Sequence, residues 1–506
     1  MNFKRTLYIT HRWFGIVMSM MFFFWFASGI VMLYVEYPEL TERERVNAAS
    51  LLELKAINTS FFDIEDQISS ESAINQLDLL SVLGRPVYKL TFADNSKAII
   101  YADNGNTLKN IQPSDAEKIA TLYAQNSDPA SQNNTPEYLA SIEMDQWTVY
   151  GGFNEHRPLH KVGLNNTKGT ILYISSLTGE VLRDTHRYER MWNWVGSTIH
   201  WIYPMQLRKH SNLWVNVVIV ISIAGVISVV SGTIVGFLRL RLKRRYKNGA
   251  VTPYTGIQKW HHLLGVMFAL FITMFIVSGL FSMNPFGVFN NKTSSVEQIN
   301  RYTGGTYDLT KFDQSLENLN DNAEAMQDIK ELSWQMLDGE GLLIAKRENG
   351  NNLLDPLRIV TNLNAKELEP KTRSAIYQLL PDSELVKLDK ITEYDNYYYT
   401  THNRYMPLPV FRARFSDIEN TWYYIDAATS KILARSTQKD RIKRWLYNGL
   451  HSLDFKFLLV NWPLREAIVI FLSITGVIFS LTSLVMAWRR LRKIKLLKTQ
   501  QLTNSQ

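Results

Sequence analysis

The chain has 506 residues, a formal net charge of +8, a mean hydropathy of −0.14 and no cysteine. The lack of cysteine excludes disulfides, thiolate zinc sites, cysteine-ligated iron–sulfur clusters and covalently attached haem. Of the 55 Lys and Arg residues, 16 lie in three segments that hold no Asp or Glu, namely 1–12, 239–260 and 489–506. This clustering of positive charge is typical of membrane topology and argues against nucleic-acid binding.

Four stretches of the chain contain no Asp, Glu, Lys or Arg. They are 22 to 29 residues long and comprise 13–35, 211–238, 263–291 and 467–488. A hydrocarbon layer requires about 20 apolar residues per helix, so we expect four transmembrane helices. Short basic segments stay in the cytoplasm, so we expect both termini and the middle loop on that side. No small-x-small cleavage site follows the first stretch, which predicts an uncleaved helix.

The predicted domains follow these boundaries along the chain. We expect a first transmembrane helix in 1–35, a periplasmic domain in 36–210, a second helix in 211–238, a basic loop in 239–260, a third helix in 261–285, a second periplasmic domain in 286–465, a fourth helix in 466–488 and a basic tail in 489–506.

The two periplasmic domains are predicted to be α+β. Alternating apolar residues on either side of Asp94-Asn95 predict a hairpin of 87–92 with 97–101. The other expected elements are strands at 171–174 and 422–426, a turn at 178–181, helices at 114–123 and 313–326, and a loop at 127–136.

The sequence matches itself at a nearly constant offset. The matches include His11 with His261, Gly15 with Gly265 and Ser28-Gly29 with Ser278-Gly279 at an offset of 250, and His200 with His451 at an offset of 251. The fold prediction is therefore a membrane protein with a four-helix transmembrane bundle from an internal duplication. A pseudo-twofold axis along the membrane normal would relate the two halves.

The duplicated histidines lie at the edges of the predicted spans. His11 and His261 precede the first and third spans on the cytoplasmic side, and His200 and His451 precede the second and fourth on the outer side. Two imidazoles that approach one axis from opposite helices can hold an iron between them, so two haem groups with neutral nitrogen ligands are predicted. The alternative is that each histidine only satisfies backbone or lipid headgroups at a helix end.

Two features near these histidines leave alternatives open. His262 is an alternate ligand to His261, because adjacent helical residues point about 100° apart and only one can face the iron. The repeat favours His261. Small residues near the histidines would let a haem macrocycle approach the helices closely, or would serve only helix–helix packing. These residues are Gly15, Ser28, Gly29, Gly265, Ser278 and Gly279.

Several segments resemble the PepSY-associated transmembrane helix family over nearly the whole chain. They are His11-Arg12-Trp13-Phe14-Gly15 with Ser28-Gly29, Asp145-Gln146-Trp147, Arg157-Pro158-Leu159-His160-Lys161-Val162, Tyr173-Ile174 with Thr178-Gly179-Glu180-Val181, and the His200 segment. The resemblance implies PepSY-like periplasmic domains, b-type haem, a bacterial inner membrane location and electron transfer toward a periplasmic acceptor. The second half departs from this pattern, because Met406-Pro407-Leu408-Pro409 stands where Arg157-Pro158-Leu159-His160 does.

Two functions remain as predictions. In the first, the protein is an oxidoreductase that carries electrons through two haem b groups to a periplasmic ferric complex such as a ferric siderophore, for iron uptake. No Gly-rich dinucleotide fingerprint is evident, so a quinol, a flavin or a cytoplasmic partner would supply the electrons. Candidate acceptor contacts are His156, His160 and His402, with solvated surface histidines as the alternative. In the second function, the external domains bind a peptidase or sensor partner without catalysis.

Overall fold

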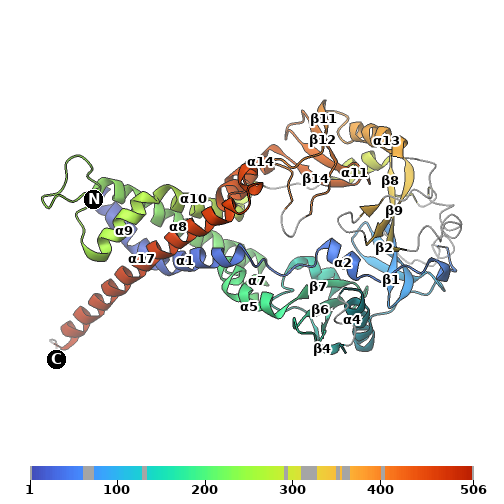
Figure 1. Cartoon of the computed structure of the whole chain (residues 1–506), viewed down its shortest axis with the longest axis horizontal. Helices are drawn as coiled ribbons and strands as arrows, with labels where there is room; N and C mark the ends of the chain where they lie inside the picture. Colours follow the sequence, from blue (N-terminus) through green and yellow to red (C-terminus); the bar gives the residue numbers. More distant parts are fainter. Residues whose placement is uncertain are drawn as a thin grey trace. The chain divides into compact units, whose positions relative to one another are not determined.

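The computed structural model describes residues 3–60, 73–127, 134–289, 294–308, 311, 328–348, 354–355, 365–400 and 405–503 (Figure 1). The chain divides into two compact units. We call them the helical unit, 1–37, 189–290 and 439–506, and the sheet unit, 38–188 and 291–438. Each unit therefore contains segments of both halves of the sequence. The predicted helix at 313–326 and most of the predicted loop at 127–136 lie outside the described residues.

Long apolar helices form the helical unit. Among the described residues, three are long and apolar enough to cross a membrane, namely α1 (Phe3–Met32), α8 (Ser211–Arg239) and α17 (Leu464–Thr503). Helix α1 packs against both α8 and α17. Their shared core is built from large apolar side chains such as Met18, Phe22 and Val229.

The third predicted span is bent rather than straight. Helices α9 (Gly256–Met267) and α10 (Ala269–Ser282) meet at Phe268 with an angle of 70°, so the pair is a broken span or a re-entrant loop. Phe268 has φ −103° and ψ 11°, outside the helical range. No proline is present at the break. The Phe268 ring packs 6.1 Å from the Phe471 ring of α17, a tertiary contact that the sequence does not reveal.

The sheet unit contains a six-stranded sheet to which both halves of the chain contribute (Figure 1). Its order is β10-β9-β8-β1-β2-β3, and β1 pairs with β8 in antiparallel fashion, with Leu79 opposite Leu332. The two segments that we expected as separate domains therefore share one continuous sheet. The strands are β1 (Ile74–Val82), β2 (Arg85–Phe92), β3 (Lys97–Tyr101), β8 (Ile329–Leu337), β9 (Glu340–Arg347) and β10 (Leu354–Asp355).

Two four-stranded antiparallel sheets complete the sheet unit, one from each half. Apolar faces of helices α4 (Pro113–Ser127) and α13 (Ala365–Gln378) pack against them. The predicted hairpin, the strands at 171–174 and 422–426 and the helix at 114–123 are confirmed. The strands are β4 (Glu137–Ile142), β5 (Leu159–Gly163), β6 (Ile171–Ser175) and β7 (Val181–Thr185), then β11 (Leu385–Ile391), β12 (Val410–Phe415), β13 (Trp422–Asp426) and β14 (Ile432–Ser436).

Short helices connect these elements in both halves. Helices α2 and α11 both begin with a capping box, in which a hydroxyl side chain and a Glu or Gln three residues later satisfy free backbone N–H groups. The short helices are α2 (Glu42–Ala48), α5 (Arg187–Val195), α6 (Ser197–His200), α7 (Met205–Arg208), α11 (Val296–Thr303), α14 (Gln438–Arg444), α15 (Leu450–Ser452) and α16 (Lys456–Leu459), with single turns η1 (Leu54–Ala56), η4 (Gly151–His156), η5 (Pro285–Gly287) and η8 (Trp445–Gly449).

Candidate functional site

The four duplicated histidines lie in two pairs within the helical unit. The ring centres of His11 and His261 are 6.4 Å apart, and those of His200 and His451 are 6.0 Å apart. We call these the inner pair and the outer pair, after their predicted sides of the membrane. A metal–nitrogen bond of about 2 Å on each side, plus about 1 Å from nitrogen to ring centre, places two rings about 6 Å apart. Both pairs therefore have the separation of imidazoles that flank one metal ion.

Equivalent serines hold the rings of the outer pair. His200 Nδ1 lies 3.0 Å from Ser28 Oγ, and His451 Nδ1 lies 3.1 Å from Ser278 Oγ. His451 Nδ1 also lies 3.1 Å from the carbonyl oxygen of Phe275. Within the described part of the chain, Nε2 of neither histidine has a hydrogen-bond partner. A fixed Nδ1 and an unpartnered Nε2 is the arrangement found in histidines that bind a metal.

Backbone constraints around the outer pair also agree between the two halves. A Cβ atom on Gly29 would lie 3.7 Å from Cε1 of His200, and a Cβ on Gly279 would lie 3.3 Å from the equivalent atom of its histidine. Ile202 and Leu453 each follow their histidine by two residues and have φ values of 52° and 54°. Such left-handed conformations cost a non-glycine residue about 1–3 kcal/mol. Strain at the same place in both halves makes this pair a candidate functional site.

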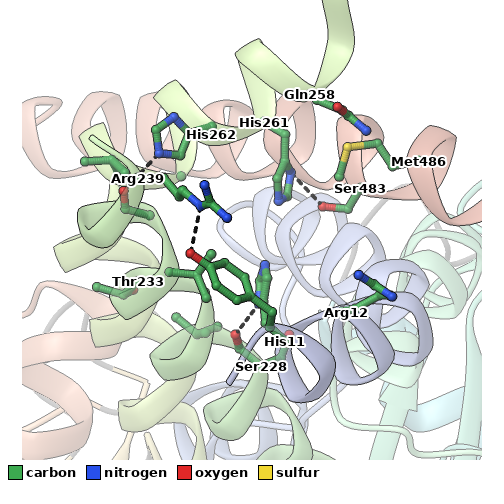
Figure 2. A pocket seen from close by; sticks show the side chains of 18 of the residues that line it. His11, Arg12, Ser228, Thr233, Arg239, Gln258, His261, His262, Ser483 and Met486 are labelled. Atoms are coloured by element: carbon green, nitrogen blue, oxygen red, sulfur yellow. Dashed lines mark hydrogen bonds between the residues drawn. The ribbon is translucent and has the colours of Figure 1, made fainter. Parts of the chain in front are cut away.

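The rings of the inner pair have different partners on the two sides. His11 Nδ1 lies 3.1 Å from the carbonyl oxygen of Ser228. His261 Nδ1 lies 3.0 Å from Thr482 Oγ1 and 3.2 Å from Ser483 Oγ. The described residues again offer no hydrogen-bond partner to either Nε2, and Figure 2 shows the two rings pointing toward one another. The inner pair therefore also presents one nitrogen from each ring.

Close packing fixes the two inner rings as well. A Cβ atom on Gly232 would collide with the His11 ring. Phe479 stacks on His261 with ring centres 4.7 Å apart and 12° between the ring planes. Our sequence predictions missed Ser228, Gly232, Phe479, Thr482 and Ser483. The repeat gives a signal for some of them, because Ser228 and Gly232 stand 251 positions before Phe479 and Ser483, although the residue types differ.

His262 differs from the four paired histidines because both of its ring nitrogens are engaged by the protein. Nδ1 lies 2.8 Å from Thr252 Oγ1, and Nε2 lies 2.9 Å from the carbonyl oxygen of Gly236. The side chain is buried and faces away from the space between the inner rings (Figure 2). The geometry thus favours His261 over His262 as the ligand.

A cavity of about 960 Å³ opens beside the inner pair, within the helical unit (Figure 2). This volume is near the upper end of the range of small-molecule and cofactor pockets, which is about 300–1,000 Å³. Gly15 lines the cavity, and a Cβ atom on it would meet no atom within 4 Å. Gly265 also lines it and leaves room for the Phe479 ring, which would lie 2.9 Å from a Cβ at that position. The cavity therefore has room for a large ligand beside the two rings.

The ligand types at the two pairs fit haem. Among the described residues, no group of three or more His, Asp or Glu side chains is placed to hold a metal ion. Each pair instead offers two imidazole nitrogens, a ligand set that would suit a haem iron. At the inner pair the cavity would also leave space for a macrocycle.

His156 does not present a nitrogen to an external acceptor. It ends η4 and is buried, with Nδ1 3.1 Å from Ser175 Oγ and Nε2 2.7 Å from Lys97 Nζ. Burial and then the neighbouring Lys97 charge lower the pKa of His156. The chain forms a helical turn at His156, before β5, so His156 and His160 lie on different elements.

His160 is likewise buried inside the sheet unit, on β5. Its Nδ1 lies 3.2 Å from the hydroxyl of Tyr138, and its Nε2 lies 2.8 Å from the carbonyl oxygen of Ile111. It is therefore a core histidine rather than a solvated one. The third candidate, His402, lies outside the described residues.

Helices long and apolar enough to span a bilayer, combined with antiparallel sheets, define a membrane protein that also contains folded β-sheet regions. The sequence model of the family described as PepSY-associated TM region matches residues 8–490, and the chain belongs to that family. A comparison with curated protein sequences gives no match.

Proposed function

We propose that the protein is a di-haem b electron-transfer protein of the bacterial inner membrane that reduces a periplasmic acceptor, a ferric siderophore, in iron uptake. One observation carries the proposal. Each of two imidazole pairs has ring centres about 6 Å apart, a fixed Nδ1 on both rings and an unpartnered Nε2 on both.

The proposal assigns distinct roles to the residues of the two pairs. Haem bound between two histidines supplies reversible one-electron transfer, which requires no acid or base from the protein. His11 and His261 would hold one group, and His200 and His451 the other. The Ser28 and Ser278 hydroxyls would orient the outer rings so that Nε2 faces the iron.

The proposal also includes the finer topology. The α9–α10 pair would serve as the third span of a four-helix bundle that arose by duplication, with both termini in the cytoplasm. Electrons would enter at the inner pair from a quinol, a flavin or a cytoplasmic partner and leave at the outer pair. The sheet unit would then face the periplasm, next to the ferric complex.

An optical spectrum of the purified protein tests the proposal. We expect b-type bands after reduction with dithionite, two haems per chain, and reoxidation on addition of a ferric siderophore. Replacing exposed His210, which also lies in the helical unit, with alanine is the matched control and should leave the spectrum unchanged. A protein that binds no haem would refute the proposal and leave a partner-binding role for the sheet unit.

A further inference from the structure

The cavity beside the inner pair has a strongly unbalanced charge. Five of its lining residues are cationic, and none of the described lining residues is Asp or Glu; the cations are Lys4, Arg5, Arg12, Arg239 and Arg490. Basic residues near the cytoplasmic ends of helices are expected from membrane topology alone. The direction in which these side chains point is therefore more informative than their number.

Arg239 is held so that its guanidinium faces the cavity. Its Nε donates a 2.7 Å hydrogen bond to the hydroxyl of Tyr8, and the guanidinium carbon lies 4.9 Å from the centre of the Tyr8 ring. The Tyr246 hydroxyl donates a 3.0 Å hydrogen bond to the Arg239 carbonyl oxygen. Figure 2 shows the guanidinium between His262 and the inner pair, while Arg12 lies on the other side of His11.

The terminal nitrogens of Arg239 remain available for a ligand. The hydrogen bond to Tyr8 uses Nε, and the described residues provide no acceptor for Nη1 or Nη2. A guanidinium fixed by an aromatic ring and a hydroxyl is preorganised to bind a carboxylate or phosphate through two parallel hydrogen bonds.

Arg490 is the equivalent of Arg239 in the second half. The two residues are separated by 251 positions, the same offset that relates His200 to His451. Arg490 lies on α17 and lines the same cavity. Each half therefore contributes one arginine as well as one histidine to the inner site.

We infer that Arg239 and Arg490 form a binding site for two anionic groups of the ligand that enters the inner cavity. The inference rests on the proposed function, under which the two groups are the propionate carboxylates of the inner haem. The phosphate headgroup of an anionic lipid offers the same chemistry, namely oxygen anions that accept paired hydrogen bonds from guanidinium.

The test uses the full chain and compares Arg239→Gln/Arg490→Gln with Arg239→Lys/Arg490→Lys and with Lys243→Gln, the control at an exposed cation that does not line the cavity. The first readout is the rate at which haem is lost to excess apomyoglobin. The inner haem is assigned to the kinetic phase that is missing in His11→Ala. We expect the double glutamine variant to lose inner haem about 10- to 100-fold faster, since charge-assisted hydrogen bonds are removed. The rate of the lysine variant should lie between those of the glutamine variant and the wild type, and Lys243→Gln should match the wild type.

A second readout distinguishes the source of the anion. In nanodiscs with phosphatidylglycerol, bound lipid is counted by native mass spectrometry for the same variants. Fewer bound phosphatidylglycerol molecules in the glutamine variant, with unchanged haem loss, would assign the arginines to a lipid headgroup. Equal behaviour of the glutamine variant and Lys243→Gln in both readouts would overturn the site. A wild type without haem refutes the proposed function, while the lipid count still decides whether the arginines bind an anion.

Discussion

The outer and inner histidine pairs differ in how closely the two halves of the chain agree. Around the outer pair, Ser28 and Ser278 hold equivalent nitrogens, and strained Ile202 and Leu453 follow at equivalent positions. Around the inner pair, a backbone carbonyl holds one ring, whereas two hydroxyls and a stacked phenylalanine hold the other. A pair of histidine rings can thus be oriented by equivalent neighbours, as in the outer pair, or by different neighbours, as in the inner pair.

The difference distinguishes two requirements of such a site. One is to orient the two imidazole rings, and the other is to fit one particular ligand. To orient each imidazole, the protein needs a hydrogen-bond acceptor at its Nδ1. In the outer pair a serine hydroxyl lies at this atom of both rings. The outer pair is not fully symmetric, because Tyr447 stacks on His451 with ring centres 5.4 Å apart, whereas Gly196 occupies the equivalent position in the first half. The inner pair has diverged further, and it is the pair beside the large cavity.

The largest expected effect follows from removing one ligand of each pair. His11→Ala should abolish only the inner haem and His451→Ala only the outer haem, because each pair has its own ring partners. Pyridine haemochrome analysis should find haem content reduced from two to one per chain in either variant. Loss of both haems in both variants would contradict two independent centres.

Replacing a glycine near each pair with alanine should affect haem binding at the inner pair more than at the outer pair, because the added Cβ has less space there. A Cβ on Gly232 collides with the His11 ring, so Gly232→Ala should displace that ring and remove most of the inner haem. Gly29→Ala is the matched control in the outer pair, because its Cβ would lie at an ordinary contact distance of 3.7 Å. Alanine normally stabilises a helix by about 0.5–1 kcal/mol relative to glycine, so loss of haem in Gly232→Ala could not be ascribed to a weaker helix. Haem quantification of both variants checks this.

Serine substitutions should sharpen the comparison within the outer pair. Ser28→Ala leaves His200 Nδ1 without its hydroxyl partner and should weaken outer haem binding by about 10-fold or more. Ser278→Ala should have a smaller effect, because the carbonyl oxygen of Phe275 still lies 3.1 Å from His451 Nδ1. Equal effects of the two variants on haem loss would show that the serines do not act through Nδ1.

The smallest expected effect on either pair comes from the sheet unit. Glu180 forms a 2.8 Å ion pair with Lys89. Burial favours the neutral form of Glu180, but the ion pair and hydrogen bond with Lys89, together with His156 and Lys97, lower its pKa to about 2. Because this pKa lies below the ordinary value, the pair stabilises the folded unit above about pH 4.5, and that stability is lost as the pH falls toward 2. Thermal unfolding followed by tryptophan fluorescence should show a flatter acid dependence in Glu180→Gln. Its haem spectrum near neutral pH should match the wild type.

The sequence predicts the elements whose signal is local or repeated. Alternating apolar residues around Asp94-Asn95 predict the β2–β3 hairpin, and the offset predicts which histidines meet. The pairing of β1 with β8 cannot be predicted this way, because it joins strands about 250 residues apart with no turn between them to set the register.

The details of the candidate site depend on tertiary contacts that no spacing reveals. The bend at Phe268 has no proline to mark it, and it arises within a uniformly apolar run. The choice between His261 and His262 depends on Thr252 and the carbonyl oxygen of Gly236, which reach His262 from other elements. Residue types therefore identify the candidate ligands, and the fold supplies the hydrogen-bond partners that orient them.

The β1–β8 pairing has a consequence for any chain that contains only one half. Such a chain would leave β1 as an open edge, with unpaired N–H and C=O groups that favour association with another strand. Two copies could satisfy each other by antiparallel pairing of the same edge, which is a closed twofold contact. The present protein then resembles a dimer whose subunits have been tethered, and separating its halves should produce self-association rather than two monomers.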